Sequence, residues 1–290
     1  MSNIPTAPMV KLPTPVSYTA AGAVEALPAD ADFSAGLLET MRAQSGTIPL
    51  LSLHMARFTR CAAVATSELG QIQQSAQQLA TMTANWPYGA RIRFRFGLLD
   101  QIVRWDFYAV PLEAFSPWSR GVVLQCCDTR LNPSASASPF SLSKTRSSEA
   151  PAAVPGCKLL RREIYDQAGG EAALQPEPEA DAPLKEGLLL DADGLVIECL
   201  RSNLLLHKAG RWMTPSLDVC GVRGVMLGWL AGRVEISEDR FSLRDLALAD
   251  ELAVCNGVRG VVPVVGFGET VLATGPATGR LQQLIAENLW

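Results

Sequence analysis

Histidine is scarce in this sequence, and its cysteines do not fall at metal-binding spacings. The 290 residues contain two histidines, His54 and His207, and seven cysteines without a single C-x-x-C motif. Structural zinc sites are built from such residues at characteristic spacings, so no metal site is expected. An odd number of scattered cysteines is typical of a reducing compartment, where each thiol packs as a small apolar side chain. The sequence therefore predicts free thiols and a cytoplasmic protein.

Long apolar runs and clusters of basic residues are also missing. No stretch of eighteen apolar residues occurs, and residues 1–30 lack the unbroken apolar segment of a signal peptide. The net charge is −4 and the basic residues do not form runs, whereas proteins that bind nucleic acids usually carry a basic patch. We therefore expect neither a membrane nor a nucleic acid as a partner.

The composition is that of a globular protein, at a length that favours two domains. Apolar residues make up 48% and charged residues 19% of the chain, and 290 residues exceed the usual size of one domain. The patterns predict a mixed α/β (α+β) fold, with a smaller α/β domain over residues 1–118 and a larger β-rich domain over residues 125–290. Residues 130–156 are rich in Ser, Pro and Ala and are predicted to form a long loop.

Hydrophobic periodicity predicts the elements of the first half. Residues 50–69 have apolar residues at helical spacing, and residues 68–86 are predicted to form a second helix. Residues 90–99 alternate with period two, which predicts a strand paired in a hairpin with residues 102–112. The two faces of that strand carry arginines on one side (Arg91, Arg93, Arg95) and apolar residues on the other (Ile92, Phe94, Phe96).

The second half is predicted to be mostly β with a few helices. Residues 151–168 lead from the loop into a helix, with Lys158 at the junction. Two hairpins are expected over residues 186–198 and 202–215, with turns at Asp-Ala-Asp-Gly and Lys-Ala-Gly-Arg. A glycine-led helix over residues 221–233 and two short strands over residues 250–268 complete the pattern.

Four features could carry chemistry, although each also has an ordinary structural explanation. Glycines before the helix at 221–233 leave backbone N–H groups free to bind a phosphate, but glycines before helices are common. Arg57, three residues after His54, has the donor fork that suits phosphate, or else faces solvent. Glu198 ends an apolar strand, so it either faces water or meets a cation inside. Lys158 is one of only five lysines against twenty arginines, yet a solvated helix start is the ordinary explanation of a single lysine.

The order of these features along the sequence is more informative than each feature alone. Arg57, Lys158, Glu198, the turn at Gly224 and "CNGVRGVVPV" follow one another as in the class IV aminotransferases, and the sequence resembles that family of pyridoxal-phosphate (PLP) enzymes. The similarity covers residues 33–265 and includes "LLETMRAQSGTIPLLSLHMARF", "CDTRLNP", "PGCKLLRREIYDQA" and "VIECLRSNLLLHKAGRWMTPSLDVCGVRGVM". Within the family it is similar above all to the 4-amino-4-deoxychorismate lyases.

The resemblance implies a two-domain fold of type IV, a PLP cofactor and a role for each matching residue. Lys158 would form the Schiff base with PLP and then move protons, since only a primary amine can do so. Glu198 would face the pyridine nitrogen, and Arg57 would bind the cofactor phosphate. Backbone groups of Val225, Met226 and Gly257 would complete the phosphate site. Family members are usually homodimers that act on small molecules, so a homodimer is expected.

The implied activity is a β-elimination that gives p-aminobenzoate and pyruvate for folate synthesis. An amino-acid transaminase, branched-chain or D-specific, is the alternative, and a catalytically silent binding protein is a second one. Glu163 stands where branched-chain transaminases tend to have a tyrosine, which favours the lyase. Three features depart from the family: Arg161 stands in place of an asparagine, Met226 and Gly257 stand in place of hydroxyl residues, and residues 133–155 form a longer connection than usual. The two missing hydroxyl groups predict weaker cofactor affinity. Arg93, Arg95 and Arg259 are candidates for binding a substrate carboxylate.

Overall fold

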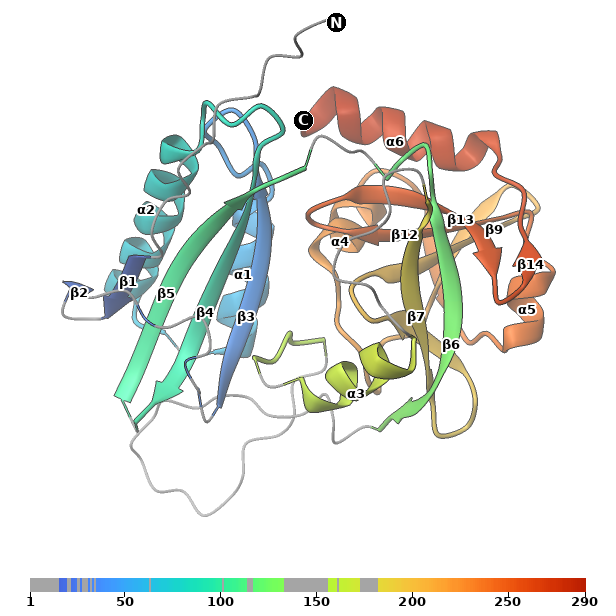
Figure 1. Ribbon diagram of the computed structural model, residues 1–290, viewed down its shortest axis with the longest axis horizontal. Helices are drawn as coiled ribbons and strands as arrows, with labels where there is room; N and C mark the ends of the chain where they lie inside the picture. Colours follow the sequence, from blue (N-terminus) through green and yellow to red (C-terminus); the bar gives the residue numbers. More distant parts are fainter. Residues whose placement is uncertain are drawn as a thin grey trace, which may run out of the picture.

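The computed structural model describes most of the chain. The described residues are 16–19, 22–24, 27, 31, 33, 35–62, 64–100, 102–113, 117–132, 156–160, 162–172 and 182–290. Nearly all of the predicted loop at 130–156 and Arg161 lie outside these ranges. Figure 1 shows the described elements in two groups, the first around one sheet and the second around another.

The first group is built on an antiparallel sheet of five strands in the order β2-β1-β5-β4-β3. The strands are β1 (Val16–Thr19), β2 (Gly22–Val24), β3 (Ala35–Ala43), β4 (Ala90–Leu99) and β5 (Ile102–Pro111). Two helices pack against it, α1 (Leu51–Cys61) and α2 (Thr66–Met82), and share one apolar core with β3, β4 and β5. The predicted hairpin of β4 and β5 is confirmed.

The predicted alternation along β4 is confirmed, with one difference at Arg95. Ile92, Phe94 and Phe96 are buried in the core as expected. Arg95 is also buried, and its Nε donates to Asp106 Oδ1 on β5 at 2.9 Å. A buried guanidinium needs such a partner, and the antiparallel register places Asp106 directly opposite.

The prediction of a continuous helix over residues 50–69 is wrong. The helix α1 ends at Cys61, Ala62 is extended, and α2 begins at Thr66. Periodicity read along the sequence continues through this break because the next helix has a similar apolar spacing. The break turns the chain so that two helices, rather than one long helix, cover the sheet.

The second group is a larger curled sheet in the order β11-β10-β9-β12-β13-β6-β7-β8, with β14 paired to β13. Its strands are β6 (Val122–Leu131), β7 (Leu184–Asp191), β8 (Val196–Cys199), β9 (Asn203–Lys208), β10 (Arg211–Pro215), β11 (Ile236–Asp239), β12 (Glu251–Asn256), β13 (Gly260–Phe267) and β14 (Thr270–Val271). Its helices are α3 (Glu163–Glu171), α4 (Val225–Ala231), α5 (Leu243–Ala247) and α6 (Pro276–Asn288).

The turns predicted in this half are confirmed. Asp191 accepts hydrogen bonds from the N–H groups of Asp193 and Leu195, and Gly194 has a positive φ of 80°, which closes the β7–β8 hairpin. Ala209 and Gly210 both have positive φ between β9 and β10, as a tight hairpin turn requires. The predicted strands around residues 250–268 and the glycine-led helix are also present, as β12, β13 and α4.

Lys158 does not lie at the start of a helix, contrary to the prediction. Helix α3 begins only at Glu163. Lys158 lies in an extended segment that pairs with β3, because Leu38 N–H donates to the Lys158 carbonyl and Leu160 N–H donates to the Gly36 carbonyl, each at 2.9 Å. The lysine of the second group is therefore fixed to a strand of the first.

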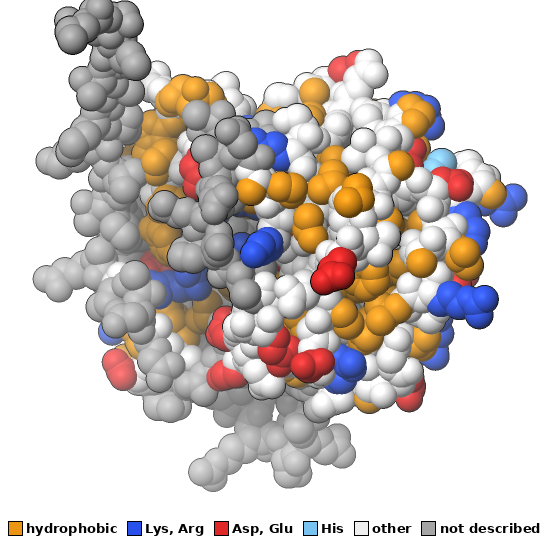
Figure 2. Space-filling view, turned by 45° about the vertical axis from the view of Figure 1, so that its right-hand side comes forward, with side chains coloured by type: hydrophobic (Ala, Val, Ile, Leu, Met, Phe, Trp, Pro, Cys, Tyr) orange, Lys and Arg blue, Asp and Glu red, His pale blue; other side chains and the backbone are white. Residues whose placement is uncertain are grey.

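The helices and strands form a mixed α/β fold, as predicted. Figure 2 shows acidic, basic and hydrophobic side chains interspersed over one face. Within the part of the chain that the structure describes, no helix is long and apolar enough to cross a membrane. Strands β5 and β6, which end the first sheet and enter the second, are separated by residues 112–121.

Candidate active site

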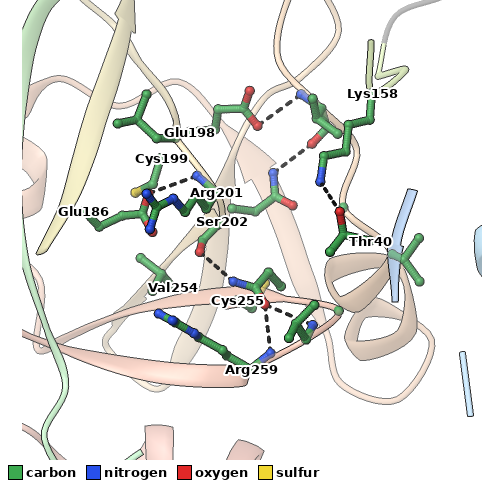
Figure 3. Close-up of a pocket in the computed structure, with 18 of the residues that line it drawn as sticks. Thr40, Lys158, Glu186, Glu198, Cys199, Arg201, Ser202, Val254, Cys255 and Arg259 are labelled. Atoms are coloured by element: carbon green, nitrogen blue, oxygen red, sulfur yellow. Dashed lines mark hydrogen bonds between the residues drawn. The ribbon is translucent and has the colours of Figure 1, made fainter. Parts of the chain in front are cut away.

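A cavity of about 610 Å³ lies where the two groups of elements meet, and it brings together residues far apart in the sequence. Its walls include Lys158, Glu198, Arg57 and Gly257, together with Thr40 of β3. Figure 3 shows Lys158 on one side of this space and Glu198 on the wall beside it. The predicted pair of an amine and a carboxylate therefore shares one cavity.

Lys158 is held as a candidate nucleophile. Its Nζ donates to Thr40 Oγ1 at 3.3 Å. Burial lowers the pKa of Lys158 to about 7, and the positive charges of Arg162 and Arg57 act in the same direction. About half of such an amine is neutral at pH 7, and the neutral form is the one that attacks a carbonyl carbon.

Glu198 is buried at β8 and has partners for both oxygens. The Tyr165 hydroxyl donates to Oε1 at 2.6 Å and the Val222 N–H donates to Oε2 at 3.1 Å. Burial raises the pKa of Glu198, although these two hydrogen bonds oppose the shift. Each carboxylate oxygen can accept a further bond, so Glu198 retains the capacity to pair with a protonated nitrogen inside the cavity.

Arg57 is bound to a buried carboxylate that was not among the predicted site residues. On β3, Leu37, Glu39 and Met41 are buried in the core shared with α1, whereas Leu38 and Thr40 line the cavity. Glu39 Oε1 accepts from Arg57 Nε at 2.8 Å, Oε2 also binds Arg57 Nη2, and Arg57 Nη1 donates to the Arg223 carbonyl. The sequence contained a signal for this cluster. An acidic residue lies between two apolar residues of a predicted strand, and a histidine and an arginine three residues apart follow on a helix.

The same carboxylate fixes His54. His54 Nδ1 lies 2.7 Å from Glu39 Oε2, and both residues are almost fully buried. Burial opposes ionisation of Glu39, but the charge of Arg57 and the hydrogen bonds from His54 and Arg57 outweigh it and lower the pKa of Glu39 to about 2. Glu39 is therefore ionised, and it links the arginine and the histidine of α1.

The glycine-led turn before α4 is shaped by close contacts. A Cβ atom at Gly224 would lie 1.9 Å from Asn203 Oδ1, so only glycine fits there. Gly224, Val225 and Gly257 all line the cavity. The Met226 side chain is fully buried in the core of the second group and is not among the lining residues.

Three arginines were candidates for binding a substrate carboxylate, and the structure separates them. Arg95 is paired with Asp106 in the core, and Arg93 donates to the Tyr108 hydroxyl at 3.0 Å. Arg259 lines the cavity, near Arg201 and the buried Glu186. Burial raises the pKa of Glu186 to about 7, and its Oε1 accepts the Arg201 N–H at 2.9 Å.

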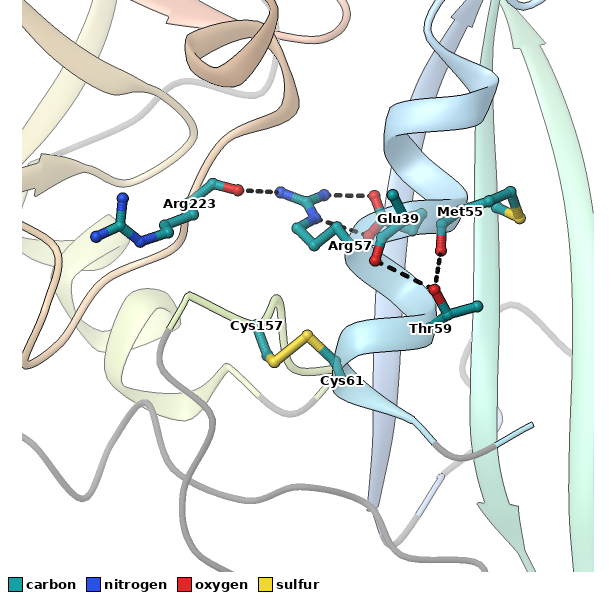
Figure 4. Close-up of a disulfide and its surroundings, with 8 residues drawn as sticks. Glu39, Met55, Arg57, Thr59, Cys61, Cys157 and Arg223 are labelled. Carbon is teal, nitrogen blue, oxygen red and sulfur yellow. Dashed lines mark hydrogen bonds and ion pairs between the residues drawn. A yellow bond between two sulfur atoms is a disulfide. The ribbon is translucent and has the colours of Figure 1, made fainter. Parts of the chain in front are cut away.

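A disulfide joins the two groups of elements beside Lys158, which corrects the prediction that all cysteines are free. Cys61 at the end of α1 is bonded to Cys157, the residue before Lys158 (Figure 4). The five other cysteines are free thiols, and most are buried. Among the described residues, no group of three or more His, Cys, Asp or Glu is placed to hold a metal ion.

The family profile named amino-transferase class IV matches residues 36–267. The chain belongs to this family. Its members are PLP-dependent lyases and transaminases, so the predicted family, fold type, enzyme class and cofactor are confirmed.

Similar proteins are named either aminodeoxychorismate lyases or aminotransferases. It is 28% identical over 200 residues to the aminodeoxychorismate lyase of Vibrio harveyi, an alignment that covers 67% of this chain and 64% of the relative. The 4-amino-4-deoxychorismate lyase structure from Pseudomonas aeruginosa is similar with a TM-score of 0.70 and 25% identity, covering 91% of this chain and 97% of that one. A PLP-bound hypothetical aminotransferase from Mycobacterium tuberculosis has the same fold, with a TM-score of 0.74, 15% identity and coverage of 94% and 98%.

Proposed function

We propose that this chain is a 4-amino-4-deoxychorismate lyase. The observation that carries the proposal is that Lys158 and Glu198, with Arg57 beside them, line one cavity of about 610 Å³. The similarity to enzymes of that name from Vibrio harveyi and Pseudomonas aeruginosa supports the choice of substrate. The domain division at residues 118–125 is part of the same proposal.

The residues that line the cavity suit PLP. Lys158 offers a primary amine with a lowered pKa, Glu198 offers a buried carboxylate for the ring nitrogen, and Arg57 offers donors for the phosphate. Backbone N–H groups of Val225, Met226 and Gly257 complete the phosphate site in this proposal. When bound, the cofactor supplies a conjugated ring that accepts the electron pair released at the substrate carbon.

The residues around the cavity then have distinct tasks. Glu198 holds a proton on the ring nitrogen, because an ionised carboxylate in a buried site is best stabilised by a cation. Lys158 removes a proton from the substrate carbon that bears the amino group, and Thr40 keeps the amine within hydrogen-bond distance. Tyr165 and the Val222 N–H fix the orientation of Glu198.

The overall reaction needs neither water nor a second substrate. Loss of the enolpyruvyl group from the ring converts one molecule into p-aminobenzoate and pyruvate, and the proton removed from the ring carbon balances the one gained by the leaving group. Lys158 is placed to carry that proton because it is the amine that lines the cavity. A transaminase, in contrast, needs a 2-oxo acid as a second substrate.

This difference in substrates gives the test. Purified protein loaded with PLP is incubated with aminodeoxychorismate alone, and separately with alanine or leucine plus 2-oxoglutarate. We expect p-aminobenzoate and pyruvate in equal amounts from the first mixture and no glutamate from the second. Turnover only in the second mixture would replace the lyase by a class IV transaminase.

The hypothesis of a catalytically silent binding protein is tested by the colour of the protein. Because Lys158 and Glu198 line the same cavity, we expect the purified protein to be yellow with PLP and Lys158→Ala to lose the visible absorption band. A wild-type protein that is colourless after PLP is added and the unbound cofactor is removed by gel filtration would favour the silent member of the family. Lys158→Arg serves as the matched control, since it keeps a long basic side chain that cannot form the Schiff base and should also lack the band.

The oligomeric state and the compartment are also proposals. We infer a homodimer because the family usually forms one, and light scattering after gel filtration tests it. We also propose a cytoplasmic location, because five of the seven cysteines are free thiols as in a reducing compartment, and expect the enzyme in the cytosolic fraction of fractionated cells.

A further inference from the structure

In the described part of the chain, a buried nitrogen of His54 at the cavity has no hydrogen-bond partner. His54 Nδ1 lies against the ionised carboxylate of Glu39, so Nδ1 carries the proton of the neutral ring. The other nitrogen, Nε2, is buried and finds no hydrogen-bond partner among the described residues. His54 is only 2% exposed, yet it is one of the residues that line the cavity.

The unpartnered nitrogen faces the turn at Gly257. A Cβ atom at Gly257 would lie 3.2 Å from His54 Nε2 and 3.4 Å from Cε1. The ring edge therefore lies beside the position where the family commonly has a hydroxyl residue and this chain has none. Gly257 belongs to the proposed phosphate site, as does Arg57, which is three residues from His54 on the same helix.

Arg57 alone supplies little net charge for a phosphate. Of its five N–H donors, two are bound to Glu39 and one to the Arg223 carbonyl, which leaves two. Glu39 also neutralises its charge. Arg223 is itself paired with Asp218 and Glu238. A phosphate dianion placed here would meet one neutral ion pair and a neutral imidazole.

The charged groups that act on His54 are Glu39 of β3, Arg57 of its own helix and Lys158 of the extended segment. Burial lowers the pKa of His54, although the hydrogen bond and charge of Glu39 oppose the shift. The ring is therefore neutral in the absence of an anion. A second negative group beside Nε2 would stabilise a proton there, since His54 would then lie between two anions.

We propose that His54 is a phosphate ligand of this enzyme, which takes up a proton on Nε2 when the cofactor binds and donates it to a phosphate oxygen. The protonated ring supplies the donor that a hydroxyl residue at position 257 would otherwise give. The inference rests on the proposed function, because it assumes that a phosphorylated cofactor occupies the cavity. It adds a residue and a proton that the similarity to the family does not assign.

The proton has a defined source. The second ionisation of a phosphate monoester has a pKa of about 6, so below that pH the ligand brings the proton with it. Above that pH the phosphate is a dianion, and the proton must come from solvent. Cofactor affinity should therefore fall by up to about tenfold per pH unit above neutrality, as one proton is taken up for each phosphate bound.

The test uses pyridoxamine 5′-phosphate and pyridoxamine as probes, because neither can react with Lys158. Binding to the cofactor-free protein is measured by titration calorimetry in two unreactive buffers of different ionisation enthalpy, which gives the number of protons taken up. His54→Asn keeps a donor for Glu39 but has no atom at Nε2. His54→Gln places a neutral donor near the Nε2 position.

We expect wild-type protein to take up one more proton with the phosphorylated probe at pH 8 than His54→Asn does. The asparagine variant should bind the phosphorylated probe roughly 10- to 100-fold more weakly, the range for losing a charged hydrogen bond, with little change for pyridoxamine. His54→Gln should recover part of the affinity without the pH dependence. Should the asparagine variant fail to fold, as judged by circular dichroism, the pH dependence of the glutamine variant decides.

Equal affinity of wild type and His54→Asn for the phosphorylated probe, or equal weakening for both probes, would overturn the role of His54. An identical proton uptake in wild type and both variants would overturn it as well. Failure of the wild-type protein to bind either probe, or to turn yellow with PLP, would instead remove the proposed function. The two failures are thus distinguishable.

Discussion

At the scale of single residues, the chemistry of the site depends on how burial and neighbouring charges change the pKa of Lys158. Burial is the largest cause of its lowered pKa, followed by the charges of Arg162 and Arg57, while Glu39 acts in the opposite direction. Arg162 is oriented by its contact with the Tyr165 ring and by a hydrogen bond to the Leu200 carbonyl. The positive charge of Arg162 therefore has a fixed place near the amine.

This arrangement predicts how fast cofactor-free protein captures PLP at different pH values. Only the neutral amine attacks, so the rate of growth of the visible band should rise with pH, with its midpoint at about 7. Arg162→Gln should move the midpoint to higher pH because it removes a positive charge, whereas Arg162→Lys should leave it nearly unchanged. A midpoint near that of an ordinary lysine in all three proteins would contradict the lowered pKa.

Arg259 gives a second prediction at this scale. It lines the cavity, and its described neighbours Arg201 and Glu186 lie at the same end. If it binds a substrate carboxylate, Arg259→Gln should raise KM by roughly 10-fold or more, the cost of a lost charged hydrogen bond, with a smaller effect on kcat. Arg259→Lys should be intermediate. Steady-state kinetics with aminodeoxychorismate measure the split, and an unchanged KM would exclude Arg259 from substrate binding.

Lys158, Glu198 and Arg57 became candidates through the resemblance to the family, and the structure brings the three to one cavity. Glu39 and the unpaired nitrogen of His54 were missed, since their significance depends on which face of β3 packs against α1. Alternation along β3 places Glu39 on the same face as Leu37 and Met41. This pattern indicates that Glu39 is buried and needs a partner. The partner on α1 could be inferred only after the two elements were known to be adjacent.

At the scale of elements, the start of α4 is determined by the contact between Gly224 and Asn203. The Asn203 side chain donates to the Val222 carbonyl at 2.9 Å and occupies the space that a side chain at position 224 would need. The strand β9 and the helix α4 are therefore joined through a backbone position that tolerates no Cβ.

Two glycines of this region make a matched pair of tests. Gly224→Ala should destabilise the protein by about 1–3 kcal/mol, the usual cost of overpacking, because its Cβ would lie 1.9 Å from Asn203 Oδ1. A Cβ added at Gly228, inside α4, would have no such neighbour within 4 Å. Gly228→Ala should therefore stabilise the protein by about 0.5–1 kcal/mol. Urea unfolding measures both, and equal effects would show that the contact with Asn203 is unimportant.

The contacts of Glu39 on β3 with His54 and Arg57 on α1 make the stability of the protein depend on pH in the acidic range. The folded pKa of Glu39, about 2, is below its usual value of 4.5. Its contribution to stability is therefore complete above pH 4.5 and is lost as the pH falls towards 2. Glu39→Gln should reduce the free energy of unfolding by roughly 3–5 kcal/mol at pH 7, because it leaves buried Arg57 unpaired.

The difference between wild type and Glu39→Gln should then shrink between pH 4.5 and pH 2, as seen in thermal unfolding across this range. Glu235→Gln, at an exposed position after α4, is the control and should follow wild type. A difference that stays constant with pH would mean that Glu39 is not ionised in the folded protein.

Local patterns predicted most elements of the chain but not the setting of Lys158. The hairpins at 186–198 and 202–215 were predictable because their turn residues and alternating strands are encoded within a few residues. The extended segment that holds Lys158 is stabilised by hydrogen bonds to β3, more than a hundred residues away in the sequence. Helical spacing after residue 158 belongs to α3, which begins later.

At the scale of the whole molecule, the two sheets are joined at the active site by backbone pairing and by a covalent bond. The segment of Lys158 pairs with β3, and Cys157 is bonded to Cys61 at the end of the helix that carries His54 and Arg57. Scattered cysteines predicted free thiols because no spacing rule connects residues 96 positions apart. The bond thus fixes the amine of one part relative to the phosphate-binding candidates of the other.

The disulfide leads to a prediction that is independent of activity. Unfolded protein should show five thiols without reductant and seven after reduction, because five of the seven cysteines are free. A cross-link between residues 96 apart restricts the unfolded chain, so reduction should lower the free energy of unfolding by about 4–5 kcal/mol. The double variant Cys61→Ser, Cys157→Ser should match the reduced wild type and show no response to reductant. Seven thiols without reductant, with a stability that reductant does not change, would mean that the two parts are joined by packing and hydrogen bonds alone.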